Sequence, residues 1–105
     1  MSLPLHPDAE SEMNRATLRY ASDDPAVAVE FAEKLDAAFD AILSSPRMYP
    51  IAEDAPDGYE VRHLLLHRFP YRVLYYATDN RIVVLAVAHT SRRPGYWIDR
   101  LTEAT

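Results

Sequence analysis

Three short runs of strand-forming residues between positions 59 and 89 constrain the fold of this chain more than any other feature. They cover about 59–67, 71–78 and 81–89 and are rich in Leu, Val and Tyr. Pro70 lies in the first junction and Asp79-Asn80 in the second, and both are turn formers. The runs therefore predict an antiparallel meander. Leu3 and Leu5 predict a further short edge strand at the N-terminus.

Two apolar stripes at helical spacing precede the strands. The first stripe consists of Ala9, Met13, Ala16 and Tyr20 and predicts a helix over 8–22. The second stripe predicts a helix over 25–44 and consists of Phe31, Leu35, Ala38, Phe39 and Ile42. Asp24 can cap the second helix and Pro25 suits its first position. Glu30 and Lys34 are spaced for an ion pair. Two helices joined this tightly predict an αα-hairpin.

The order of elements predicts a single α+β domain over residues 1–105. It reads β-α-α-β-β-β, with a final helical turn at 96–101. A helical hairpin can cover only one face of a small sheet. In the run 71–78, Tyr71, Val73 and Tyr75 alternate with three residues that point the other way, namely Arg72, Leu74 and Tyr76. We expect the Arg72 face to be open, because burying an unpaired guanidinium is costly. Such a face, both apolar and basic, is typical of a binding surface.

The net charge of −5 conceals a division along the chain. Residues 1–60 carry 4 basic and 13 acidic side chains, whereas residues 61–105 carry 7 arginines and 3 acidic side chains. A basic half on an acidic protein suggests a local anionic partner, although helices that collect acids and strands that collect arginines would give the same counts. The chain has no cysteine, and its N-terminus lacks the apolar segment of a signal peptide, so we expect a cytoplasmic protein.

The C-terminal half carries a familiar pattern. RHLLLHRFPYRVLYY at 62–76, the turn at Asp79-Asn80 and VLAVAHTSRRPGYW at 84–97 resemble the RelE/ParE superfamily of bacterial toxins. With the helical hairpin, the resemblance extends from about residue 6 to residue 101. These proteins are the growth-inhibiting halves of type II toxin–antitoxin modules and are also called plasmid stabilisation proteins. The resemblance implies no cofactor or metal, and a hetero-oligomer in which the C-terminal segment of a cognate antitoxin wraps around the toxin.

The superfamily has two activities, and the resemblance leaves both open. RelE-like members are metal-free endoribonucleases that cut mRNA on the ribosome, and ParE-like members poison DNA gyrase by binding. Metal-free RNA cleavage needs a base for the 2′-OH, a cation for the charged phosphate and an acid for the leaving oxygen. Arg72 matches an arginine of the ribonuclease branch in its Tyr-Arg-Val-Leu-Tyr context. The other candidate catalytic residues are His89, Arg92, Arg93 and Tyr96.

Departures from the ribonuclease pattern favour the ParE-like activity. The lysine-rich strand is absent, the His-Tyr pair of some members is here His89-Thr90, and no carboxylate near Gly58 clearly matches the glutamate base of another subgroup. We therefore rank a gyrase poison first, a ribonuclease second and an inactive partner-binding member third. The residues predicted to contact antitoxin or target are Arg62, Arg68, Arg72, Leu74, Tyr76, Arg92 and Arg93.

Several of these residues also have purely structural interpretations. Arg72 could pair with an antitoxin carboxylate, and His89 could be a hydrogen-bonded residue at a strand end. Tyr96 and Trp97 could form a packing lid over the core. His63 and His67 lie on one predicted strand, but two histidines without a third ligand are weak support for a zinc site, and we predict none.

Overall fold

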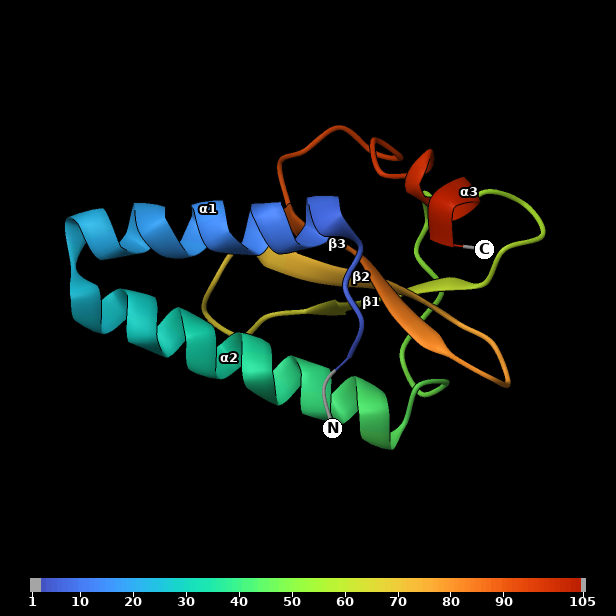
Figure 1. Ribbon diagram of the computed structural model, residues 1–105, viewed down its shortest axis with the longest axis horizontal. Helices are drawn as coiled ribbons and strands as arrows, with labels where there is room; N and C mark the ends of the chain where they lie inside the picture. The colour runs from blue at the N-terminus through green and yellow to red at the C-terminus, as the bar shows by residue number, and fades with distance from the viewer. Residues whose placement is uncertain (1–2, 105) are drawn as a thin grey trace.

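The chain folds as a helical hairpin followed by a three-stranded sheet and a short C-terminal helix (Figure 1). The computed structural model describes residues 3–104. Its elements are α1 (Pro7–Asp23), α2 (Pro25–Ser44), β1 (Val61–Leu65), β2 (Tyr71–Ala77), β3 (Ile82–His89) and α3 (Arg100–Ala104). The predicted α+β class, the hairpin and the meander are confirmed. The bounds of the two long helices and the three strands lie within two residues of those predicted.

The sheet is antiparallel, in the order β1-β2-β3. Its register pairs Tyr71 with His89 and Arg72 with Ala88, and a bulge separates Leu74 from Tyr75. The predicted N-terminal strand is reduced to a single parallel bridge between Leu5 and Val84 at the outer edge of β3. The edge position was thus predicted correctly, while the chain turns into α1 too soon for a full strand to form.

A side chain caps the N-terminus of each long helix, which allows α2 to begin directly after α1 ends. The Nδ1 atom of His6 accepts a hydrogen bond from the Asp8 N–H at 3.0 Å and caps α1. Asp24 caps α2 as predicted, because its Oδ1 atom accepts a hydrogen bond from the Ala26 N–H at 3.0 Å. The predicted Glu30–Lys34 ion pair is wrong, since Glu30 pairs instead with Arg68 in the turn between β1 and β2.

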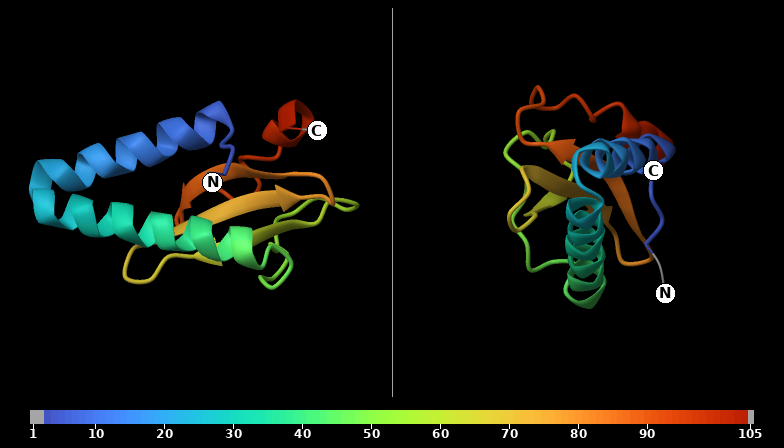
Figure 2. Two further views of the ribbon diagram at one scale, coloured as in Figure 1. Left: turned by 60° about the horizontal axis from the view of Figure 1, so that its bottom comes forward. Right: turned by 90° about the vertical axis from the view of Figure 1, so that its left-hand side faces the viewer.

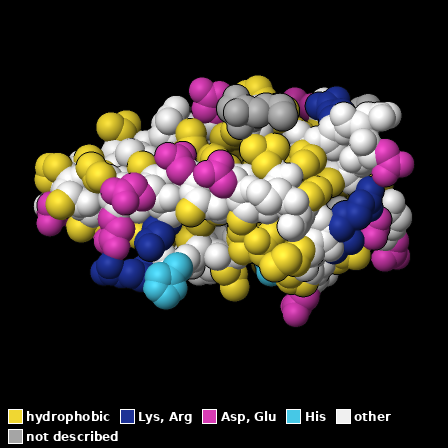
Figure 3. Space-filling model, turned by 90° about the horizontal axis from the view of Figure 1, so that it is seen from below, with side chains coloured by type: hydrophobic (Ala, Val, Ile, Leu, Met, Phe, Trp, Pro, Cys, Tyr) yellow, Lys and Arg dark blue, Asp and Glu magenta, His cyan; other side chains and the backbone are white. Residues whose placement is uncertain are grey.

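The helical hairpin covers the face of the sheet that carries Tyr71, Val73 and Tyr75, as predicted (Figure 2). The stripes of both helices are buried there, and aromatic rings dominate the contact: Tyr20, Phe31, Phe69 and Tyr71 lie with ring centroids 5.0–6.3 Å apart. Acidic side chains are spread over the outer side of α2, including the exposed Glu33, Asp36 and Asp40 (Figure 3). Within residues 3–104, no helix combines the length and hydrophobicity that crossing a membrane requires.

The opposite face is not open, which corrects the expectation drawn from Arg72. The connection before β1 and the C-terminal segment 96–104 cover it, and Leu74 and Trp97 are both 0% exposed. Trp97, Leu101 and Ala104 recur at i, i+4 and i+7 and so present one apolar stripe to the sheet. The interpretation of Trp97 as part of a packing lid therefore holds. The chain itself supplies the cover that we had assigned to a partner.

The turn between β1 and β2 stores backbone strain at Arg68, whose φ is 74°. Left-handed backbone costs an L-residue with a Cβ about 1–2 kcal/mol, whereas glycine adopts it freely. Alanine and glycine at this position both remove the ion pair with Glu30. We therefore expect Arg68→Gly to be about 1 kcal/mol more stable than Arg68→Ala in urea unfolding. Equal stabilities would contradict the strained conformation.

Candidate functional site

The sheet separates the two best candidate catalytic residues. Arg72 pairs in register with Ala88, and both belong to the face covered by the C-terminal segment. His89 pairs with Tyr71, which belongs to the helix face, and the two rings meet edge to face at 5.1 Å. Because neighbouring residues of a strand point to opposite faces, Arg72 and His89 project away from each other. The structure thus does not bring these two side chains into one site.

Arg72 is held by a carboxylate of its own chain. Its Nη1 and Nη2 atoms donate to Oδ1 and Oδ2 of Asp54 at 3.2 and 2.7 Å. The same carboxylate accepts hydrogen bonds from the Gly95 N–H at 2.8 Å and from the Trp97 Nε1–H at 3.0 Å. The Asp54 side chain is only 10% exposed and that of Arg72 18%. This cluster joins the connection before β1, strand β2 and the C-terminal segment, and we call it the Asp54 clamp.

The Asp54 clamp shifts the titration of the groups in and around it. Burial alone would raise the pKa of Asp54, but the hydrogen bonds from Arg72, Gly95 and Trp97 outweigh it and lower the pKa to about 2. Burial, and then the positive charge of Arg72, lower the pKa of His63, whose Nδ1 atom lies 3.4 Å from Arg72 Nη1. Asp54 is therefore ionised and His63 neutral at pH 7.

The depressed pKa of Asp54 predicts a specific loss of stability in acid. The folded-state pKa of about 2 lies below the ordinary value of 3.8, so the contribution is fully present above the ordinary value and is lost as the pH falls towards 2. Its size is about 2 kcal/mol. We expect the difference in unfolding free energy between the native protein and Asp54→Asn to shrink by that amount from about pH 6 to pH 2. A difference that is independent of pH would contradict this assignment.

A second carboxylate, that of the buried Glu12 in α1, also holds the C-terminal segment, through Tyr96 and Arg100. Its side chain is 5% exposed and accepts hydrogen bonds from the Val87 N–H at 3.1 Å, the Tyr96 hydroxyl at 2.6 Å and both Nη atoms of Arg100 at 2.8 and 3.1 Å. Burial, and then the hydrogen bond to Glu12, raise the pKa of Tyr96 far above its ordinary value. Tyr96, a predicted catalytic residue, thus serves as a donor to Glu12. We call this cluster the Glu12 clamp.

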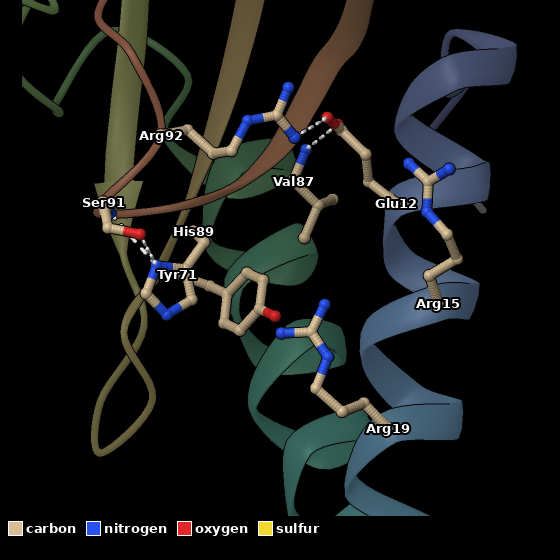
Figure 4. Close-up of a pocket in the computed structure, with 8 residues that line it drawn as sticks. All are labelled: Glu12, Arg15, Arg19, Tyr71, Val87, His89, Ser91 and Arg92. Atoms are coloured by element: carbon tan, nitrogen blue, oxygen red, sulfur yellow. Dashed lines mark hydrogen bonds and ion pairs between the residues drawn. The ribbon is translucent and has the colours of Figure 1, made fainter.

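An arginine-lined cleft of about 250 Å³ lies beside the Glu12 clamp, between α1 and the end of β3 (Figure 4). Arg15 and Arg19 reach it from α1, and His89 and Arg92 reach it from the end of β3 and the loop that follows. The Arg92 guanidinium lies 3.8 Å from the centre of the Tyr96 ring. The Nδ1 atom of His89 accepts a hydrogen bond from the Ser91 N–H at 3.0 Å. Two candidate catalytic residues, His89 and Arg92, therefore line this cleft, without Arg72.

The other predicted contact residues are scattered. Arg62 donates to the Tyr49 carbonyl at 2.6 Å, and Tyr76 lies half-buried with its ring 5.9 Å from that of Tyr59. Leu74 is fully buried on the face of the sheet that the C-terminal segment covers. Arg93 is exposed and makes no ion pair within residues 3–104. The roles of these residues in binding or catalysis stay predictions.

Sequence reasoning missed the residues that organise both clamps and the cleft. Asp54 is one of the carboxylates near Gly58 that match no base of the family, and Glu12 lies beside the apolar stripe of α1, so neither carries a local signal. The pair Arg15 and Arg19 carried a readable signal: like charges at i, i+4 on a helix repel each other and suggest an anionic partner. Within residues 3–104, no three His, Cys, Asp or Glu side chains group as metal ligands would.

Comparisons with known proteins agree with this architecture. The model of the family described as "ParE toxin of type II toxin-antitoxin system, parDE" matches residues 3–94. A solved structure titled "Chromosomal ParDE TA system from P. aeruginosa" contains a chain with the same fold, at a TM-score of 0.68 and 18% sequence identity. That match covers 85% of this chain and 95% of the other. No curated protein sequence matches the chain significantly.

Proposed function

The chain belongs to the ParE family of toxins of type II toxin–antitoxin systems, and from this premise we propose that it inhibits growth by binding DNA gyrase and is silenced by a cognate antitoxin. The observation that carries the choice of binding over cleavage is the position of Arg72. It lies on the opposite face of the sheet from His89, and Asp54 already occupies its guanidinium. A ribonuclease that used Arg72 would have to break the Asp54 clamp first.

The position of Tyr96 supports the same choice. Its hydroxyl donates to the buried Glu12 carboxylate, and its pKa is raised by burial and by that contact, so it is a poor general base. The residual candidates for RNA cleavage are His89 and Arg92 in the arginine-lined cleft. Arg72, the arginine by which the chain resembles the ribonuclease branch, does not line this cleft.

Two parallel assays test the proposal. The purified protein is added to DNA gyrase acting on relaxed plasmid, and separately to a translating extract whose mRNA is mapped by primer extension. We expect inhibited supercoiling and intact mRNA. New 5′ ends within codons that disappear in His89→Gln would establish a ribonuclease instead. Inactivity in both assays, with intact Trp97 fluorescence, would identify an inactive family member. His89 is preferred over Arg72 for the variant because replacing Arg72 disrupts the Asp54 clamp.

The surface beside β1 supports an antitoxin contact. A groove of about 320 Å³ runs between α2 and β1 and is lined mainly by small and apolar side chains. Leu65, at the end of β1, is 59% exposed beside this groove. Residues 50–52 pair with β1 from Val61 to His63, so the groove lies beside the other end of the strand. An apolar groove with an exposed leucine at its rim can accept apolar side chains of a partner segment. Of the predicted contact residues, Arg93 is exposed and makes no ion pair within residues 3–104, so it is available to acidic side chains of an antitoxin. Arg68 and Arg92 are also exposed but pair with Glu30 and Glu12.

Substitution of Leu65 tests this antitoxin contact. The probe is the small protein expected from the gene beside that of the toxin. We expect Leu65→Glu to weaken its binding at least tenfold, because a charge replaces an apolar contact at the rim of the groove. Leu18→Glu is the matched control, because Leu18 is similarly exposed at 68% but lies on α1. Equal losses in both variants, or none in either, would exclude the groove beside β1 as the antitoxin site.

A further inference from the structure

The arginine-lined cleft concentrates positive charge that the protein leaves uncompensated. Arg15 and Arg19 make no ion pair within residues 3–104, although the chain has 16 acidic residues. The exposed acids Glu33, Asp36 and Asp40 belong to α2, which contributes no residue to the cleft. The acid in the cleft, Glu12, accepts the bidentate hydrogen bonds of Arg100 and lies 3.9 Å from the Arg92 guanidinium. Arg15 and Arg19 are therefore two positive charges without an acidic counterpart, and they lie beside Arg92, which shares Glu12 with Arg100.

The hydroxyl of Tyr71 opens into the same cleft. Tyr71 is only 4% exposed, and its ring belongs to the aromatic core under the helices. Its hydroxyl makes no hydrogen bond within residues 3–104, whereas the hydroxyls of Tyr75 and Tyr96 both do. Figure 4 shows this hydroxyl pointing into the cleft towards Arg19. A hydroxyl that opens into the cleft can donate a hydrogen bond to an acceptor bound there.

The groups around the cleft are donors suited to one kind of acceptor. The Nδ1 atom of His89 accepts from Ser91, so in the neutral ring the proton resides on Nε2, which can donate. Guanidinium groups match phosphate oxygens with paired hydrogen bonds. A backbone phosphodiester carries one charge on two non-bridging oxygens, and a nucleic-acid chain repeats this group at every nucleotide. Neighbouring phosphates can therefore engage donors that approach from α1 and from the end of β3.

From these contacts we propose that the arginine-lined cleft binds a phosphate of a nucleic-acid backbone. The cleft, at about 250 Å³, is smaller than typical pockets for whole small-molecule ligands. That size suits a phosphate that remains attached to a chain outside the cleft better than an enclosed nucleotide. The inference does not depend on which cellular target the toxin binds, and its test uses no gyrase and no ribosome.

Fluorescence anisotropy of a short labelled DNA duplex tests the proposal directly. We expect the native protein to bind with a dissociation constant of about 10⁻⁴–10⁻⁶ M, in the range of non-specific binding, and with a clear salt dependence. The double variant Arg15→Ala/Arg19→Ala is expected to bind at least tenfold more weakly, with a salt slope smaller by about 2. Tyr71→Phe, which keeps the ring in the core, should weaken binding by roughly threefold to tenfold.

The matched control is Lys34→Ala/Arg81→Ala, which removes the same charge. Lys34 and Arg81 make no ion pair within residues 3–104, and they border other parts of the surface. This control is expected to bind DNA within about twofold of the native protein. If the control and the Arg15/Arg19 variant lose DNA affinity equally, the loss would reflect net charge alone, and this result would overturn the proposal. Undetectable duplex binding by the native protein would overturn it as well.

Two competitors identify the source of the anion. If inorganic phosphate displaces the duplex at the same concentration of phosphate groups, the cleft is a site for small anions and the nucleic-acid assignment is wrong. If polyglutamate displaces the duplex more effectively than unlabelled DNA does, the ligand is an acidic protein segment and the proposal is also wrong. Stronger competition by unlabelled DNA than by either probe supports the backbone phosphate.

Discussion

Replacing Glu12 by alanine is expected to lower the free energy of unfolding by about 4 kcal/mol, the largest effect of any single substitution that we predict. The change leaves the Arg100 guanidinium, 12% exposed, without its bidentate acceptor. It also leaves the Val87 N–H and the Tyr96 hydroxyl without the acceptor that they share. Removing one partner of a buried ion pair costs more than the pair contributes, because the remaining charge stays desolvated.

Chemical denaturation followed by circular dichroism measures this loss. Glu10→Ala is the matched control, since Glu10 lies on the same helix and is exposed; we expect its stability to lie within about 0.5 kcal/mol of the native protein. Glu12→Gln should fall between the two, because the amide oxygen can still accept hydrogen bonds while the charge is lost. A Glu12→Ala variant as stable as Glu10→Ala would show that the C-terminal segment is held without the Glu12 clamp.

Replacing Asp54 by alanine is expected to cost about 3 kcal/mol and to loosen the C-terminal segment. The carboxylate is the shared acceptor of Arg72, the Gly95 N–H and the Trp97 indole, so one substitution removes four hydrogen bonds. The expected cost is lower than for Glu12 because Arg72 keeps 18% exposure and can recover part of its hydration.

The single tryptophan of the chain reports on this change. Trp97 is 0% exposed and its indole N–H is bound to Asp54, so we expect a red-shifted emission of Asp54→Ala under conditions in which the helices remain folded. Asp57→Ala is the control, because Asp57 is an exposed acid of the same connection. Unchanged emission together with native stability in Asp54→Ala would rule out the Asp54 clamp as the contact that seats the segment.

The two clamps together change the interpretation of the basic C-terminal half. Arg72 and Arg100, two of its seven arginines, bind buried carboxylates that come from the acidic N-terminal half. Part of the charge division seen along the sequence is therefore neutralised by ion pairs within the folded chain. Arg15 and Arg19, which belong to the acidic half, keep unpaired positive charges beside Arg92 in the arginine-lined cleft.

The helices, the strands and the family of this chain could all be predicted from the sequence, because the signals for them are local. The stripes of α1 and α2 recur within a few residues, Asp24 caps its own helix, and Pro70 and Asp79-Asn80 mark turns where they stand. Alternation along β2 correctly assigned Tyr71, Val73 and Tyr75 to the helix face. Neighbouring residues decide each of these features, so periodicity was sufficient.

Only the tertiary structure decided what covers the second face and which charges are free. Glu12 lies 88 residues from Arg100, and Asp54 lies 18 residues from Arg72 and 43 from Trp97. No local pattern encodes a pairing over such a separation, because it depends on the path of the whole chain. The rule that an arginine marks an open face failed at Arg72, since a buried guanidinium is tolerated once a distant carboxylate reaches it. The same long-range folding brings Arg15, Arg19 and the hydroxyl of Tyr71 to one cleft.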